Sequence, residues 1–153
     1  MLIEFGVENF RSIKEKVTIS MVATKDDSLD GNLIKNALND ESLLKTAAIY
    51  GSNASGKTTI AMAINFMKAL VLNSHNHQKG EGINFTPFKL DKNYPSKPTK
   101  MNIIFIKNNT KYNYAISYNN EKVIEESLHY YPNNKKASIF ERTETTSYKF
   151  TSD

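Results

Sequence analysis

The sequence predicts a single α/β domain in which one long helix accompanies a mainly antiparallel sheet. Three observations support this prediction. Apolar residues recur with a helical repeat over residues 58–73. After residue 100 the repeat changes to two, which indicates short strands. Pairs of asparagine separate these strands, and such pairs suit tight hairpin turns because asparagine tolerates a positive φ.

The composition is that of a globular chain and excludes several classes of protein. The 153 residues are 39% hydrophobic and 24% charged, and a chain of this length can bury a substantial core. The absence of cysteine excludes a disulfide framework, a thiolate zinc site and cysteine catalysis. The N-terminus carries Glu4 and Glu8 instead of the basic and apolar segments of a signal peptide, and no apolar run reaches the length of a membrane span. We therefore expect a cytoplasmic protein with no membrane partner.

The basic residues are too dispersed to indicate a dedicated DNA-binding face. The formal net charge is +4, and among 20 basic residues only Arg11 and Arg142 are arginines. The longest lysine cluster is the pair Lys135 and Lys136. Because nucleic-acid-binding surfaces concentrate their charge, this pattern favours a solvated lysine surface.

The first half of the chain contains the elements that lead into the long helix. Residues 2–7 and 17–22 have the character of two strands around Asn9-Phe10-Arg11-Ser12. Residues 24–45 are polar and predict a long connection with at most one helical turn. Residues 45–50 predict a short buried strand that ends at Gly51. The helix that follows is apolar nearly all round, which predicts burial on most of its sides.

The second half predicts a loop-rich connection and then an antiparallel meander. Residues 74–99 contain Pro87, Pro95 and Pro98, and strands are expected at 101–107, 111–118, 122–131, 138–142 and 148–150. The pattern stops at residue 153 without a closing helix, so we expect a truncated piece of a longer protein. The predicted organisation is one incomplete lobe over residues 1–153, made of residues 1–73, 74–99 and 100–153.

One motif carries recognisable chemistry. Residues 51–58 match G-x-x-x-x-G-K-[ST], and the match follows a predicted strand and opens a predicted helix, which is the context this motif requires. Glycines allow a tight turn whose N–H groups face inward, and the start of the helix adds free N–H donors and a partial positive charge. Such a loop cradles phosphates. The predicted binding residues are Gly51, Ser52, Asn53, Ala54, Ser55, Gly56, Lys57, Thr58 and Thr59.

Three side chains of this motif have distinct expected roles. Lys57 is expected to bind the β- and γ-phosphates, and the Thr58 hydroxyl to ligate Mg²⁺, a hard cation that prefers oxygen. Thr59 is expected to donate to the α-phosphate. The predicted cofactors are therefore ATP and Mg²⁺. No catalytic residue can be assigned, because only two apolar residues precede Glu125 and Glu126, and we interpret that segment as structural.

Other classes of phosphate-loop protein fit the rest of the chain less well. A Ras-like GTPase needs Asn-Lys-x-Asp, whereas Asn134-Lys135-Lys136-Ala137 lacks the aspartate. A small nucleoside kinase continues with parallel strands joined by helices, whereas this chain continues with a meander. The remaining class adds an antiparallel sheet to its nucleotide lobe.

Two segments resemble a known family. The opening at residues 3–13, which contains Asn9-Phe10-Arg11-Ser12, and the motif region at residues 50–58 are similar to the N-terminal half of an ABC-type ATPase head. Within that class the chain resembles RecF-like and structural-maintenance-of-chromosomes-like heads. It is most similar to the prokaryotic AAA-family ATP-binding proteins that include abortive-infection and OLD-like anti-phage ATPases.

The resemblance implies a site residue, partners and a biological setting. Arg11 would lie beside the nucleotide and contact phosphate or adenine, the alternative being an arginine on an exposed strand end. ATP hydrolysis would take place between two heads, which implies a second head in a homodimer, and DNA or a protein effector as further partners. The implied setting is phage defense or DNA maintenance.

Two alternatives remain open at this stage. One is the nucleotide-binding domain of an ABC transporter, against which stands the Asn-Phe-Arg-Ser opening. The other is a module that senses nucleotide without hydrolysing it. Neither a Ser-Gly-rich signature nor an apolar strand ending in Asp-Glu is present, and Gln78 cannot be assigned as a Q-loop glutamine. We expect the parent protein to be an ATPase, and residues 1–153 alone to bind Mg-nucleotide weakly without appreciable turnover.

Overall fold

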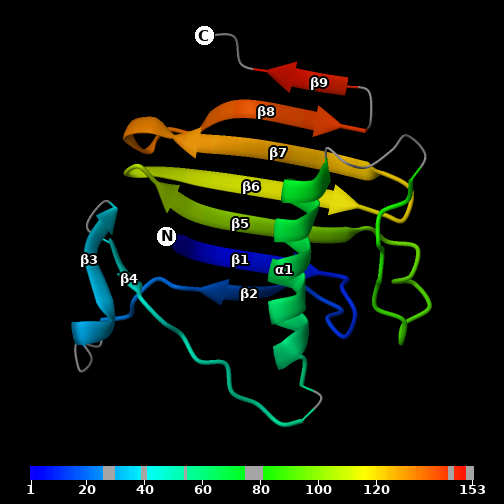
Figure 1. The fold of residues 1–153 in the computed structure, drawn as a ribbon, viewed down its shortest axis with the longest axis horizontal. Helices are drawn as coiled ribbons and strands as arrows, with labels where there is room; N and C mark the ends of the chain where they lie inside the picture. Colours follow the sequence, from blue (N-terminus) through cyan, green and yellow to red (C-terminus); the bar gives the residue numbers. More distant parts are fainter. Residues whose placement is uncertain (26–29, 39–40, 54, 75–80, 145–146, 151–153) are drawn as a thin grey trace.

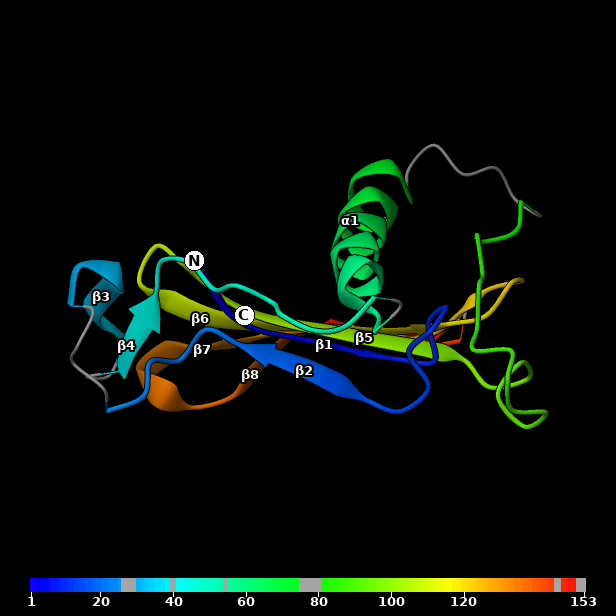
Figure 2. The ribbon, with the colours of Figure 1, turned by 90° about the horizontal axis from the view of Figure 1, so that it is seen from below.

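The described part of the chain folds into one large antiparallel sheet with one long helix on one face (Figures 1 and 2). The computed structural model describes residues 1–25, 30–38, 41–53, 55–74, 81–144 and 147–150. The seven strands of the large sheet have the order β2-β1-β5-β6-β7-β8-β9, and β3 and β4 form a separate hairpin. The elements are β1 (Leu2–Glu8), β2 (Val17–Ser20), η1 (Asp30–Asn32), β3 (Leu33–Leu38), β4 (Glu41–Leu44), α1 (Lys57–Asn73), β5 (Thr99–Lys107), β6 (Thr110–Tyr118), β7 (Val123–Tyr131), η3 (Pro132–Asn134), β8 (Ala137–Thr143) and β9 (Ser147–Phe150).

Strands β5 to β9 form the predicted meander, with every pairing antiparallel. The turn between β5 and β6 uses Asn108 and Asn109 with φ of 49° and 57°, as expected of a two-residue hairpin. Asn119 acts differently, because its Oδ1 atom accepts hydrogen bonds from the backbone N–H groups of Glu121 and Lys122. The sheet is completed by β1, which pairs with β5 although about ninety residues separate them.

The core lies between the sheet and α1. The rows Phe5–Ile103–Tyr114 and Val7–Met101–Ile116 run across neighbouring strands on the face that α1 covers. The helix contributes buried residues such as Met67, and the ring of Phe66 stacks on that of Tyr118 with centroids 5.3 Å apart. The main members of this cluster are Phe5, Val7, Phe10, Ile13, Ala63, Met67, Met101, Ile116 and Tyr118. Tyr114, Ile116 and Tyr118 of β6 therefore belong to the core that α1 covers.

The expectation that α1 is buried on most sides is wrong for the described residues. Met62 is 41% exposed, Val71 50% and Leu72 59%. A flat sheet covers only one side of a helix, and Figure 2 shows α1 standing on one face of the sheet with its outer side open. Within the described ranges no helix is long and apolar enough to cross a membrane.

Residues 24–45 are not the irregular connection that their polarity predicted. They contain the hairpin β3–β4, in which Leu33 pairs with Leu44 and Ile34 with Leu43. Leu43 is buried against Ile3 and Ile106 at the end of β1 and β5. These apolar residues support a hairpin because they can form a second, small core beside the main one. Residues 26–29 and 39–40 lie outside the described residues.

The predicted buried strand at residues 45–50 is also wrong. The segment has no strand assignment, Ile49 is 46% exposed and Tyr50 is 89% exposed. Its apolar residues are compatible with a buried strand, but a strand also needs a neighbour for its backbone hydrogen bonds. None of the described strands runs beside it.

Candidate functional site

The glycine-rich loop leads into the N-terminus of α1, as the motif predicted. Gly56 has a φ of 92° and directly precedes Lys57, the first residue of α1. This backbone conformation favours glycine, because other residues meet a steric cost there. The first turn of α1 contains no acidic residue and receives no side-chain cap hydrogen bond. The N–H groups and the positive end of the helix dipole are thus available to an anion.

The side chain of Lys57 folds back over the loop. Its Nζ atom donates hydrogen bonds to the backbone oxygens of Gly51, at 2.9 Å, and Ser52, at 2.6 Å. A Cβ atom on Gly51 would lie 2.7 Å from the Ser55 hydroxyl, so a larger residue at this position would require the Ser55 side chain to move. Lys57 therefore already lies against oxygen acceptors at the start of the loop. The predicted residues Gly51, Ser52, Asn53 and Ser55 are exposed along this loop, and Ala54 lies outside the described residues.

A tight turn near the N-terminus lies against the start of α1. Phe10 and Ile13 exchange two backbone hydrogen bonds of 2.9 and 2.8 Å, which leaves Arg11 and Ser12 as the two residues at the tip. The hydroxyl of Ser12 lies 2.7 Å from that of Thr59, in the first turn of α1. The fold thus brings the Asn-Phe-Arg-Ser segment to the phosphate loop.

Arg11 is at the tip of this turn and has a φ of 51°. Its backbone N–H donates to the Thr86 oxygen at 2.7 Å, and its guanidinium lies 5.9 Å from the centroid of the Phe10 ring. The side chain is exposed. The role of Arg11 toward nucleotide stays a prediction, although the structure places its turn against the first turn of α1.

A hollow of about 380 Å³ separates the turn from the phosphate loop. Two lysines that the motif analysis did not single out, Lys14 and Lys16, line it. Lys14 also forms a 2.9 Å ion pair with Asp91, which raises the pKa of Lys14. The lining residues are Ser12, Ile13, Lys14, Glu15, Lys16, Val17, Ser55, Gly56 and Ile60. The sequence signal that could have found these lysines is their position directly after Asn-Phe-Arg-Ser.

Buried Asn9 fixes the base of the turn. Its Nδ2 group donates to the backbone oxygens of Tyr94, at 3.0 Å, and Lys97, at 2.7 Å. Its Oδ1 atom accepts from the Phe88 N–H at 2.9 Å, and its backbone oxygen accepts from the Thr99 hydroxyl at 2.6 Å. The turn is therefore anchored to the segment that precedes β5 as well as to α1.

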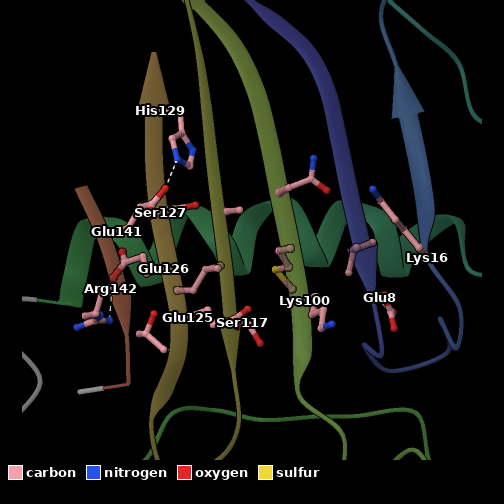
Figure 3. Close-up of a pocket in the computed structure, with 16 residues that line it drawn as sticks. Glu8, Lys16, Lys100, Ser117, Glu125, Glu126, Ser127, His129, Glu141 and Arg142 are labelled. Atoms are coloured by element: carbon pink, nitrogen blue, oxygen red, sulfur yellow. Dashed lines mark hydrogen bonds and ion pairs between the residues drawn. The ribbon is translucent and has the colours of Figure 1, made fainter. Parts of the chain in front are cut away.

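A second hollow, of about 370 Å³, lies on the opposite face of the sheet from α1 (Figure 3). Across β1, β5, β6 and β7 it presents Glu8, Lys100, Ser117 and Glu125 in one row. It has mixed charge and contains neither a helix N-terminus nor any residue of the phosphate loop. Among the described residues no group of three or more histidines, aspartates or glutamates could hold a metal ion. This face offers no comparable phosphate-binding geometry.

Of the two acidic residues on β7, Glu126 contacts neighbouring strands of the sheet. Glu126 accepts a hydrogen bond from the Tyr114 hydroxyl at 2.7 Å and forms a 2.8 Å ion pair with Arg142. Burial, together with this hydrogen bond, raises the pKa of Tyr114. Glu125 points to the other face, where it lines the second hollow. The contacts of Glu126 are consistent with the interpretation of this segment as structural, which stays a prediction.

Comparison with known families decides the class of the chain. Residues 47–147 match the model of a family described as "AAA domain, putative AbiEii toxin, Type IV TA system". The chain belongs to this AAA domain family. The match spans more than half of the chain and includes the loop, α1 and the strands β5 to β8 of the meander. A search of curated proteins found no match. Membership supports the phosphate-loop NTPase fold and nucleotide binding, in a domain whose sheet is mainly antiparallel.

Proposed function

We propose that this AAA domain binds ATP with Mg²⁺ at residues 51–59, as the nucleotide lobe of an ABC-type ATPase head related to the RecF-like and structural-maintenance-of-chromosomes-like proteins. The observation that carries the proposal is the geometry of the loop. Gly56 turns the backbone with a positive φ into α1, and Lys57 lies back across Gly51 and Ser52. A helix N-terminus without a side-chain cap and a lysine ammonium beside it form an anion site.

Different residues of the loop bind the phosphates and the Mg²⁺ ion. The phosphates lie at the N-terminus of α1, and Lys57 exchanges its backbone oxygen acceptors for phosphate oxygens. The exposed Thr58 hydroxyl is a hard oxygen donor at the start of α1 and fits Mg²⁺. Since the first turn of α1 has no acidic residue, the ion would take its other ligands largely from phosphate and water. When bound, Mg²⁺ neutralises charge on the phosphates.

The wider function rests on the resemblance to ATPase heads. In that class a second head completes the site, so the proposal includes a homodimer of heads in the full protein and ATP hydrolysis at their interface. Phage defense is the proposed setting, with DNA or a protein effector as the object of the ATP-driven change. The carboxylate of Glu126 is bound by Tyr114 and Arg142. This supports a role of the chain in binding nucleotide, with the catalytic carboxylate supplied from somewhere other than β7.

Calorimetric titration of the 153-residue chain with ATP and Mg²⁺ tests the proposal. The unaltered chain should bind, and Lys57→Ala should abolish binding because it removes the only side-chain cation of the motif. Lys68→Ala, which changes an exposed lysine farther along α1, is the matched control and should leave binding unchanged. A folded unaltered chain that does not bind, or a Lys57→Ala variant that binds normally, would overturn the proposal.

A phosphate-release assay on the same samples separates binding from catalysis. We expect no appreciable turnover by the 153 residues alone. Turnover that depends on Lys57 would show that the catalytic carboxylate lies within this chain, and Glu125 and Glu126 would be the first variants to make.

A further inference from the structure

We propose that Ser12 is a positioning residue that orients the Thr59 hydroxyl toward bound nucleotide and transmits nucleotide binding to the turn that carries Arg11. This inference rests on the proposed nucleotide site and names a residue outside the loop motif. The observation is the 2.7 Å contact between the hydroxyl oxygens of Ser12 and Thr59, which lie 47 residues apart in the sequence. Thr59 is largely buried, with 9% of its surface exposed, and its hydroxyl is in contact with that of Ser12.

Ser12 reaches Thr59 from a turn that is held by several contacts besides the packing of Phe10 and Ile13 against α1. The two hydrogen bonds between Phe10 and Ile13 fix the turn, and the Arg11 N–H holds it to Thr86. Asn9, which directly precedes Phe10, is held by the hydrogen bonds of its side chain to the segment before β5. Ser12 is therefore presented to α1 by the edge of the sheet and by the segment before β5.

The chemistry of the two hydroxyls explains why this contact matters to a phosphate. A hydroxyl has one donor and two acceptor positions. When Ser12 donates to Thr59, the proton of Thr59 is free to donate to a phosphate oxygen at the start of α1. The two hydrogen bonds then form a chain in which each strengthens the other. A β-branched threonine in a helix divides between two χ1 rotamers, so the contact with Ser12 would favour the rotamer of Thr59 that it meets as well as the direction of its proton.

The same two hydrogen bonds would also transmit nucleotide binding back to the turn that carries Ser12. If phosphate binding favours the hydrogen bond from Ser12 to Thr59, the turn is held more firmly when nucleotide is bound, as linkage between two sites requires. Arg11 is the neighbour of Ser12 at the tip, so its backbone is held with it. Ser12 also lies close to Gly56, since a Cβ atom at that position would be 3.5 Å from the Ser12 hydroxyl.

Titration of Mg-ATP and Mg-ADP into hydroxyl variants tests the inference. Ser12→Ala should weaken both by about threefold to tenfold, the range for one net hydrogen bond. Thr59→Ala should have a similar effect, and the double variant should be no weaker than either single variant. Ser12→Thr, which restores a hydroxyl, should recover most of the affinity. Ser96→Ala, in the segment before β5, is the matched serine control and should bind normally.

Amide hydrogen exchange provides the readout that a purely structural role would not move. Mg-ATP should slow exchange at residues 10–13 in the unaltered chain but not in Ser12→Ala. The inference is overturned if Ser12→Ala lowers the unfolding midpoint and leaves both nucleotide affinities unchanged, or if the two single variants are additive. Absence of nucleotide binding by the unaltered chain would instead overturn the proposed function, so the two failures are distinguishable.

Discussion

The Oδ1 atom of Asn9 accepts a hydrogen bond from the backbone N–H of Phe88 at 2.9 Å. Its Nδ2 group donates to the backbone oxygens of Tyr94 and Lys97, and Asn9 itself is only 1% exposed. One buried side chain thus satisfies several backbone groups of the segment before β5. Because unpaired buried polar groups are costly, Asn9→Ala should lower the free energy of unfolding by about 3–5 kcal/mol, measured by urea denaturation.

A matched control separates hydrogen bonding from backbone strain. Asn36 is exposed and has a φ of 52°, close to the 53° of Asn9. Asn36→Ala therefore measures the cost of alanine at a positive φ without loss of a buried network, which should be about 1 kcal/mol. Equal losses for the two variants would contradict the anchoring role of Asn9.

The one-sided burial of α1 predicts very different costs for two methionines. Met67 is 4% exposed and packs in the main core, whereas Met62 is 41% exposed on the other side of the helix. Met67→Ala should lower the free energy of unfolding by about 2–5 kcal/mol, because it leaves a cavity between α1 and the sheet. Met62→Ala should change it by no more than about 0.5 kcal/mol. A loss at Met62 comparable to that at Met67 would show that this side of the helix is covered.

The elements that the sequence predicted correctly are those whose pattern is local. The apolar repeat of α1 and the alternation of β6 each reflect one face turned toward a core. The glycine loop was also predictable, since the motif specifies its own backbone geometry within eight residues. Gly56, the second glycine of the motif, accordingly has a positive φ at the point where the loop enters α1.

The features that the sequence did not reveal depend on partners distant in the chain. Ile49 and Tyr50 are apolar enough for a buried strand, but no described strand pairs with them. The hairpin β3–β4 was missed because its small core is completed by Ile3 and Ile106. The contact of Ser12 with Thr59 involves two common hydroxyl residues, and nothing in either local segment distinguishes them before the fold brings them together.

Tyr114 should make stability fall at alkaline pH. Burial and its hydrogen bond to Glu126 raise the pKa of its phenol above the value of about 10 in an unfolded chain. The protonated phenol therefore stabilises the fold fully below pH 10, and this contribution is lost as the pH rises toward the folded-state pKa. Tyr114→Phe should be less stable by about 1–2 kcal/mol at pH 8, and the difference should shrink between pH 9 and 11.5.

Urea denaturation across that pH range checks the Tyr114 prediction. Tyr148→Phe, which alters a half-exposed tyrosine of β9, serves as the control. A stability difference between the unaltered chain and Tyr114→Phe that stays constant with pH would contradict the prediction.

The positive φ of Arg11 allows its structural and binding roles to be separated in one variant. At a φ of 51° an arginine is strained, and glycine is not. Arg11→Gly should therefore raise the free energy of unfolding by about 1 kcal/mol.

If the side chain of Arg11 contacts nucleotide, Arg11→Gly should weaken ATP binding by about 1.5–3 kcal/mol, the worth of a charged hydrogen bond, as should Arg11→Ala. Lys14→Ala and Lys16→Ala, on the hollow beside the loop, should weaken binding less. Urea denaturation and calorimetric titration on the same preparations give both quantities. A variant that is more stable and binds ATP normally would show that Arg11 is an exposed residue without a role in nucleotide binding. Lys14 and Lys16 would then be the basic side chains to test in the hollow.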